Sequence, residues 1–227
     1  MPFAHQKGMS VADNLARIKE TIGHRPIKLV AVTKTAKPSQ IEEAYACGVT
    51  EFGENRMQDA LNKQEKLPPD LVSSSNWHFI GHLQTNKVRQ AVGRFSLIQS
   101  VDSLHLAQEI SRVAQLQGTT QRILLQVKMA DDPAKFGYTP QQVKADFEQI
   151  MKLPNIKIDG LMTITPLTED ADVCKQCFIG LRQLREDLEK THGVSLKELS
   201  MGMSSDWREA ITCGATMVRL GRAIFQQ

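Results

Sequence analysis

Short runs of apolar and β-branched residues alternate along the chain with segments of helical periodicity. The runs predict eight strands, at residues 27–33, 51–55, 77–81, 97–101, 122–128, 156–164, 197–202 and 217–221. The patterns between them predict helices at 39–47, 85–92, 103–117, 140–151, 171–190 and 205–213, and a further amphipathic helix at 11–22 precedes the first strand. Residues 67–75 and 131–140 are expected to form surface loops.

This alternation indicates parallel strands that are joined by right-handed crossovers. The run Leu29–Val32 is apolar at every position, as a strand covered on both faces requires. Eight such units in 227 residues favour an α/β fold of the (β/α)8 TIM-barrel type, a single domain over residues 1–227 with an extra N-terminal helix. A doubly wound sheet is the alternative, but no Gly-x-Gly-x-x-Gly follows the first strand.

The composition narrows the class of protein. Hydrophobic residues make up 41% and charged residues 23%, as in an ordinary globular protein. A net charge of +3, two Trp and two Tyr argue against a nucleic-acid partner. The first ten residues contain no apolar signal segment, and no apolar stretch reaches membrane-spanning length. With four scattered cysteines, these features predict a cytoplasmic protein that does not bind membranes.

A lysine follows the first predicted strand directly, in the sequence AVTKTAKP. Lys34 could simply be a solvated residue at the start of a loop. In a barrel, however, reactive groups lie at the carboxyl ends of the strands. A partly desolvated amine there would have a lowered pKa and could form an imine with a carbonyl compound. Lys37 is the competing lysine, but it stands next to Pro38 at the start of a helix and is expected to be exposed.

A second candidate region lies at the other end of the chain. Ser204, Ser205 and Asp206 stand where the seventh strand gives way to a helix, and capping of that helix alone could explain them. The eighth strand ends in Arg219-Leu-Gly-Arg222. Loops after strands seven and eight commonly bind phosphate in such barrels. A lysine opposite a phosphate site suggests a ligand with both a carbonyl and a phosphate, and pyridoxal 5′-phosphate fits this description.

Over nearly its whole length the chain resembles the pyridoxal phosphate homeostasis proteins, single-domain relatives of the barrel domain of alanine racemase. The resemblance rests on the stretches LVAVTKTAKP, EFGENRMQ, WHFIGHLQTNK, IQSVDS, GLMTI, LSMGMSSDW and VRLGRAIF. It implies that Lys34 holds the cofactor as a Schiff base and that Arg219 lies beside the pyridine nitrogen. It also implies a phosphate site at Ser204, Gly221 and Arg222, and a pocket lined by Asn55 and His82.

Two positions depart from the family pattern. A small hydroxyl residue is common where Arg222 stands, so a hydroxyl–phosphate bond is in doubt there, although the backbone amide can still donate. The family also usually continues IFG, whereas this chain reads IFQQ.

The resemblance implies a role in vitamin B6 and amino- and keto-acid homeostasis, and we expect no efficient amino-acid turnover. An arginine at the pyridine nitrogen does not keep that nitrogen protonated, so the ring is a weaker electron sink. Racemisation needs two bases, and the chain ends six residues after Gly221, without the additional domain that supplies the second base in the racemases. We therefore expect a binding protein, not an enzyme: a monomer whose protein partners are transient, either apo-enzymes that require the cofactor or a regulator.

Several alternatives stay open. The chain could be a racemase or another pyridoxal-phosphate enzyme, or an aldolase-like enzyme that forms its imine with a sugar phosphate. It could also be a regulatory interaction protein whose partner recognises the cofactor-loaded state. The pair Cys174 and Cys177 lies in a helical pattern without a second pair for zinc, and His78 and His82 have no adjoining ligand cluster, so we expect no metal.

Overall fold

Eight parallel strands close into a barrel in the order β1 to β8 in the computed structural model, which describes residues 9–131, 135–168 and 170–226. β1 pairs with β2 and also with β8, where Lys28 lies beside Met217, so the first and last strands complete the ring. The (β/α)8 barrel expected from the sequence is therefore confirmed. The strands are β1 (Lys28–Val32), β2 (Glu51–Glu54), β3 (Asn76–Phe79), β4 (Leu97–Val101), β5 (Gln121–Gln126), β6 (Ile156–Met162), β7 (Glu198–Ser200) and β8 (Met217–Leu220).

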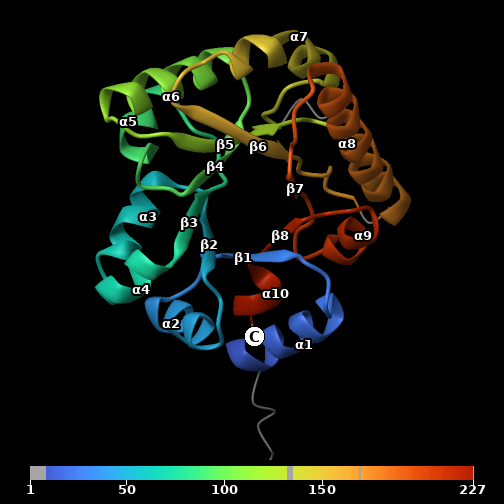
Figure 1. The fold of residues 1–227 in the computed structure, drawn as a ribbon. Coiled ribbons are helices and arrows are strands. Elements are labelled where there is room, and N and C mark those ends of the chain that lie inside the picture. Colours follow the sequence, from blue (N-terminus) through green and yellow to red (C-terminus); the bar gives the residue numbers. More distant parts are fainter. Residues whose placement is uncertain (1–8, 132–134, 169, 227) are drawn as a thin grey trace, which may run out of the picture.

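Helices surround the barrel as an outer ring (Figure 1). The expected helix before the first strand is present as α1, and the long pattern at 171–190 is α8. The helices are α1 (Val11–Ile22), α2 (Pro38–Ala46), α3 (Met57–Gln64), α4 (Pro69–Ser74), η1 (Thr85–Lys87), α5 (Val88–Ala91), α6 (Leu104–Leu116), α7 (Pro140–Met151), α8 (Ala171–His192), α9 (Trp207–Thr212) and α10 (Arg222–Phe225).

Consecutive residues of a strand contribute to two different cores. Ala31 belongs to the large hydrophobic cluster, and Val30 belongs to a smaller one. This follows from the period of two in a strand, which turns neighbouring side chains to opposite faces of the sheet. The smaller cluster consists of Val30, Leu97, Leu124, Met162 and Met217.

Helices α1 and α2 hold the C-terminal segment against the barrel. Asn14 Nδ2 of α1 donates to the carbonyl of Ile224 at 3.0 Å, and Gln40 Nε2 of α2 donates to the carbonyl of Phe225 at 3.1 Å. Figure 1 shows α10 between these two helices, next to β1. The residues after β8 are thus brought to the turn after β1, although the two segments lie at opposite ends of the sequence.

The structure corrects one predicted loop. Residues 67–75 were expected to be irregular, but Pro69–Ser74 form α4, whose Leu71 is buried. Proline is favoured at the first position of a helix, because its missing N–H has no partner there, so the two prolines start a helix here. The short helices α3 and α10 were also not predicted, because eight and four residues carry little periodicity.

Two sequence expectations fall partly outside the described residues. These are the amino-terminal segment, of which residues 1–8 are not described, and the loop at 131–140, of which residues 132–134 are not described. In the remainder of that loop, Tyr138 forms an isolated parallel bridge with Val127. Within the described ranges, no helix combines the length and the apolar character that crossing a membrane requires.

Candidate functional site

Two adjoining cavities open at the carboxyl ends of the strands, with volumes of about 320 and 360 Å³. Both are lined by Val32, Lys34, Ile80, Met203 and Arg219. The first also contains Ser204, Gly221 and Arg222, and the second contains Asn55 and His82. The structure thus brings all seven predicted site residues to these two cavities.

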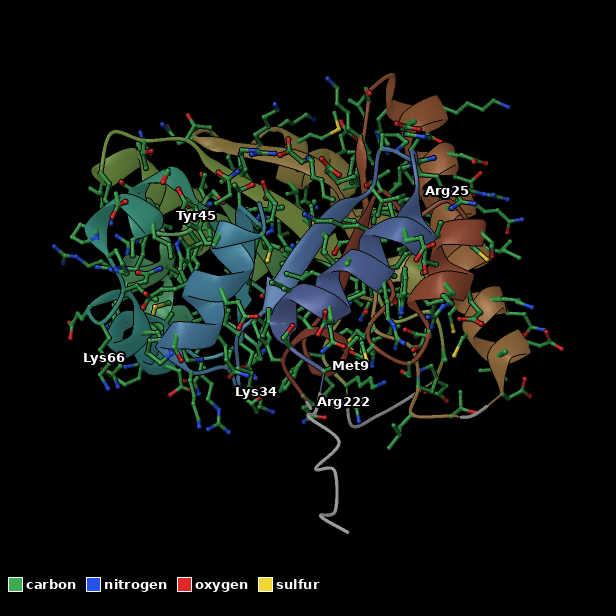
Figure 2. The ribbon with its side chains drawn as sticks, turned by 90° about the horizontal axis from the view of Figure 1, so that it is seen from below. Met9, Arg25, Lys34, Tyr45, Lys66 and Arg222 are labelled. Atoms are coloured by element: carbon green, nitrogen blue, oxygen red, sulfur yellow. The ribbon has the colours of Figure 1, made fainter. Side chains whose placement is uncertain are left out.

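Lys34 lies in the turn directly after β1, two residues beyond Val32. Its side chain is exposed, so the partial desolvation expected from the sequence is not present. Lys37 is also exposed, but it lines neither cavity. Figure 2 shows Lys34 and Arg222 at the same end of the molecule, with Arg25, which precedes β1, at the opposite end. Of the two candidate lysines, only Lys34 therefore faces the cavities.

An ion pair with a fully buried carboxylate supports the backbone of the β1 turn. Lys63 Nζ of α3 lies 2.6 Å from Glu54 Oε1 and also donates to the carbonyl oxygens of Thr33 and Lys34. Glu54 is completely buried and also accepts a hydrogen bond from the Thr33 hydroxyl. Among the described residues, its second oxygen Oε2 has no hydrogen-bond partner. This pair joins β1, β2 and α3 directly beneath Lys34, and neither member was predicted to be a site residue.

Arg219 of β8 is 2% exposed, and it reaches both cavities. Its Nη1 donates to Ser200 Oγ at 2.7 Å, and its Nη2 donates to the Thr163 carbonyl at 2.8 Å. Burial lowers the pKa of the guanidinium to about 10, against the opposing charge of Asp206. The group therefore remains a cation at neutral pH. A guanidinium cation has no hydrogen-bond acceptor, but its N–H groups can donate to an aromatic nitrogen of a ligand in the cavity.

The segment after β7 meets the segment after β8 through Ser204. Its hydroxyl accepts a hydrogen bond from the Ala223 N–H at 3.1 Å. Asp206 does not cap α9 with its side chain; its carboxylate accepts from the Met203 N–H and from the Thr165 hydroxyl, both at 2.6 Å. Capping of α9 therefore does not explain these polar residues. They shape the loop that walls the first cavity.

Gly221 allows close contact between β8 and β1. A Cβ atom at Gly221 would lie 3.2 Å from the carbonyl oxygen of Val32, so a larger residue would push the segment after β8 away from β1. Arg222 follows at the start of α10 with an exposed side chain. The first backbone N–H groups of a helix have no partner within the helix, so the backbone N–H of Arg222 can donate to a ligand oxygen.

His82 and Asn55 line the second cavity. The Nδ1 of His82 lies 3.2 Å from Asp102 Oδ2, and its ring stacks on Phe136, with centroids 3.7 Å apart and planes inclined by 13°. In the described part of the chain, Asn55 Oδ1 is buried and has no hydrogen-bond partner. An unsatisfied buried amide is costly, and a polar ligand group would relieve that cost. Asp102 follows β4 directly, so the strand-end rule could have identified it.

Gly81 is the residue whose enlargement would disturb this wall most directly. A Cβ atom at this position would lie 2.0 Å from the backbone carbonyl oxygen of Asn55, so Gly81→Ala must displace one of the two segments. We expect a loss of about 1–3 kcal/mol in the free energy of unfolding, measured by chemical denaturation, together with weaker ligand binding. Gly180→Ala in α8 is the control, because only the flexible end of Met129 lies close to it; an equal loss in both variants would contradict the prediction.

The Cys174 and Cys177 side chains are both buried in α8. Burial raises the pKa of both thiols, which keeps them protonated and unreactive at neutral pH. Among the described residues, no three side chains of His, Cys, Asp or Glu are grouped so that they could hold a metal ion.

Residues 9–227 match the family model described as alanine racemase, N-terminal domain. An alanine racemase from Clostridium difficile has a TM-score of 0.76 at 16% identity, with coverage of 96% of this chain and 56% of that one, a likeness that shows the fold alone. Fold and site thus define a barrel of the alanine racemase N-terminal class.

More similar proteins define the family. This chain is 44% identical to the pyridoxal phosphate homeostasis protein of Synechocystis over 88% of this chain and 90% of that one. It is 41% identical to that of Aquifex aeolicus, over 96% and 98%. PipY of Synechococcus elongatus, solved with pyridoxal phosphate bound, has a TM-score of 0.89 at 39% identity, with coverage of 95% of this chain and 100% of that one. The chain belongs to the pyridoxal phosphate homeostasis protein family.

Proposed function

We propose that this protein binds pyridoxal 5′-phosphate in the two adjoining cavities and serves vitamin B6 and amino- and keto-acid homeostasis. The observation that carries the proposal is the convergence of Lys34, Arg219, Ser204 and Gly221 at one end of the barrel. PipY, which is similar over its whole length, has been solved with this cofactor bound. Asn55 Oδ1, which has no hydrogen-bond partner among the described residues, and the cationic Arg219 fit a ligand with polar groups and an aromatic nitrogen.

Each residue has a part in this proposal. The cofactor would supply an aldehyde, with which the neutral Lys34 amine would condense to a Schiff base with release of water. Arg219 donates toward the pyridine nitrogen, and Ser204 with the backbone of Gly221 and Arg222 holds the phosphate. Asn55 and His82 line the side of the pocket that lies away from the phosphate.

A spectrum of the purified protein tests the proposal. We expect a visible absorption band after incubation with excess cofactor, and borohydride reduction followed by peptide mapping should find the label on Lys34. An aldolase-like enzyme would show no such band, and borohydride would trap its sugar phosphate only when that substrate is added. A protein without the band, or with the label on Lys37, would overturn the assignment.

We also propose that the loaded protein does not turn over amino acids efficiently. Arg219 stays cationic and cannot keep a ring nitrogen protonated by sharing its proton. Neither tyrosine lines the two cavities: the Tyr45 hydroxyl lies 2.9 Å from Ser74 Oγ on the outer surface, and Tyr138 is buried beside them.

The alternative is a racemase, in which His82, oriented by Asp102, would be the second base. Steady-state assays with a panel of amino acids separate the two functions. Turnover at about 1 per second or faster, lost in His82→Gln, would establish the enzyme and overturn our proposal.

The two arginines of the site should differ in their contributions. Arg219→Ala is expected to weaken cofactor binding by about tenfold or more and to shift the absorption band, because a buried charged donor is lost. Arg222→Ala should change affinity by less than about threefold, because the exposed side chain leaves its backbone N–H in place. Fluorescence titration measures both, and a larger effect at Arg222 would show that its side chain grips the phosphate.

The remaining assignments are also proposals. We propose a single-domain monomer in the cytoplasm, where the four unpaired cysteines would stay reduced. Protein partners that receive or sense the cofactor would bind transiently. Affinity capture with the loaded protein and with Lys34→Ala, each compared with the chain without cofactor, would detect them.

A further inference from the structure

A continuous row of polar side chains runs through the barrel interior behind the cofactor site. It begins at Arg219, whose Nη1 donates to Ser200 Oγ. The Ser200 hydroxyl donates to Gln99 Oε1 at 2.6 Å, and Gln99 Nε2 lies 2.7 Å from His78 Nδ1. His78 Nε2 lies 2.7 Å from Glu51 Oε2, at the start of β2. We call these five residues the interior chain.

The geometry sets the direction of every hydrogen bond. Arg219 can only donate, so the Ser200 hydroxyl turns its own proton toward Gln99 Oε1. The Gln99 amide nitrogen then faces His78, which makes Nδ1 the acceptor and places the ring proton on Nε2. That proton points to the Glu51 carboxylate. All donors therefore run from the cation at one end to the carboxylate at the other, an arrangement in which each bond polarises the next.

Secondary contacts hold this direction. Gln99 Nε2 also donates to the sulfur of Met217 at 3.1 Å, a contact that the amide would lose if its nitrogen and oxygen exchanged places. Burial raises the pKa of Glu51, but hydrogen bonds from His78 and from Asn76 outweigh burial and lower the pKa overall. Glu51 therefore remains an anion at neutral pH, and it terminates the chain as an acceptor.

Simple filling of the barrel does not require such a chain. Barrel interiors are usually packed with branched apolar side chains, and buried polar groups are costly unless every one is paired. Here Ser200 and Gln99 are fully buried, and His78 is 2% exposed. The hydrogen bonds of these residues connect to Arg219, the member of the interior chain that lines both cavities.

We propose that the interior chain positions Arg219 for the cofactor, with Gln99 as the positioning residue that couples Ser200 to His78. Gln99 lines neither cavity, so it acts only through Ser200 and Arg219. Without Gln99, the Ser200 hydroxyl is free to rotate, so the guanidinium keeps its bond to the Thr163 carbonyl but loses its fixed side-chain partner. This inference rests on the proposed function for its binding experiment, and it also has a test that needs no cofactor.

The binding test is a double-mutant cycle of Gln99→Met and Arg219→Ala, with affinity from titration and the position of the absorption band as readouts. In the wild-type background, Gln99→Met should weaken binding by about tenfold, close to the contribution of one hydrogen bond, and should shift the band. In the Arg219→Ala background it should have less than about a twofold effect. Equal effects in both backgrounds, or none in the wild type, would overturn the proposal.

Gln121→Met is the matched control. Gln121 is 2% exposed, and within the described ranges its side chain bonds only backbone groups, at Gly93, Phe95 and Arg122. The Gln121→Met variant should lose stability as Gln99→Met does, without a change in cofactor affinity or in the position of the absorption band. Ser200→Thr, which keeps the hydroxyl, should stay within about threefold of the wild type, whereas Ser200→Ala should match Gln99→Met; identical behaviour of Ser200→Thr and Ser200→Ala would contradict the chain.

Nitrogen NMR of the His78 ring tests the chain without cofactor. We expect an unprotonated Nδ1 and a protonated Nε2 in the wild type, with ring signals that move in Ser200→Ala and stay unchanged in Gln121→Met. A proton on Nδ1 in the wild type, or ring signals that ignore Ser200, would overturn the inference. If the wild type binds no cofactor, the proposed function fails, and this measurement still decides whether the hydrogen bonds of the interior chain are formed.

Discussion

Lys34→Ala should abolish the visible absorption band while leaving the barrel folded. The side chain is exposed and lines both cavities, so its removal costs little packing but removes the only bond by which the cofactor would be covalently held. We expect the apparent affinity to fall by at least about 100-fold, equivalent to about 2.7 kcal/mol. Fluorescence titration measures the affinity, and thermal unfolding of the chain without cofactor checks the fold.

The matched control for this prediction is Lys37→Ala, three residues along the same turn. Lys37 is similarly exposed and lines neither cavity. It should keep the band and an affinity within about twofold of the wild type. A band retained in Lys34→Ala and lost in Lys37→Ala would show that the wrong lysine had been assigned. Loss of the band in both variants would point to a general disturbance of the turn.

Lys63→Met should produce the largest loss of stability among the substitutions considered. It removes the cation that neutralises the completely buried Glu54, and it also removes a donor to the Thr33 and Lys34 carbonyl oxygens. Breaking a buried ion pair from one side leaves an uncompensated charge and costs about 3–5 kcal/mol. Chemical denaturation measures the free energy of unfolding. The turn that carries Lys34 should loosen as well, so cofactor affinity should fall in parallel.

Two further variants isolate the buried charge as the cause. Lys152→Met removes an ion pair of the same 2.6 Å length on the surface, where Lys152 and Glu148 are mostly exposed, and it should cost less than about 1 kcal/mol. Adding Glu54→Leu to Lys63→Met removes the orphaned carboxylate and should restore most of the stability. If the double variant is no more stable than Lys63→Met, the loss comes from packing of the lysine stem.

The barrel was predictable because each strand and helix has a local pattern. Leu29–Val32 is apolar on both faces, and Pro38 and Gly48 bound the helix that follows. The helix at Pro69–Ser74 was missed because six residues hold too little periodicity and two prolines suggest a loop. Its Leu71 is apolar because it packs on the barrel, a contact between distant segments that no local pattern encodes.

The seven proposed site residues could be proposed from the sequence because they stand at or just after strand ends in motifs of a recognisable family. Their supports were not found, since nothing in the spacing of Glu54 and Lys63 or of His82 and Asp102 says that these side chains meet. The expected desolvation of Lys34 was wrong for the same reason: burial depends on the segments that surround a turn, and here they leave the amine exposed.

By itself, the sequence determined the order of strands and helices, the barrel class and the residues that stand at the strand ends. These follow from periodicity and from chemical types that are local to each segment. The expectation that Lys34 and Arg222 share one opening came from the barrel class, whereas only the tertiary structure decided that Gln99, far from either in sequence, accepts a hydrogen bond from Ser200 behind Arg219. The physical reason is the closure of β8 onto β1, which turns positions at opposite ends of the chain into neighbours.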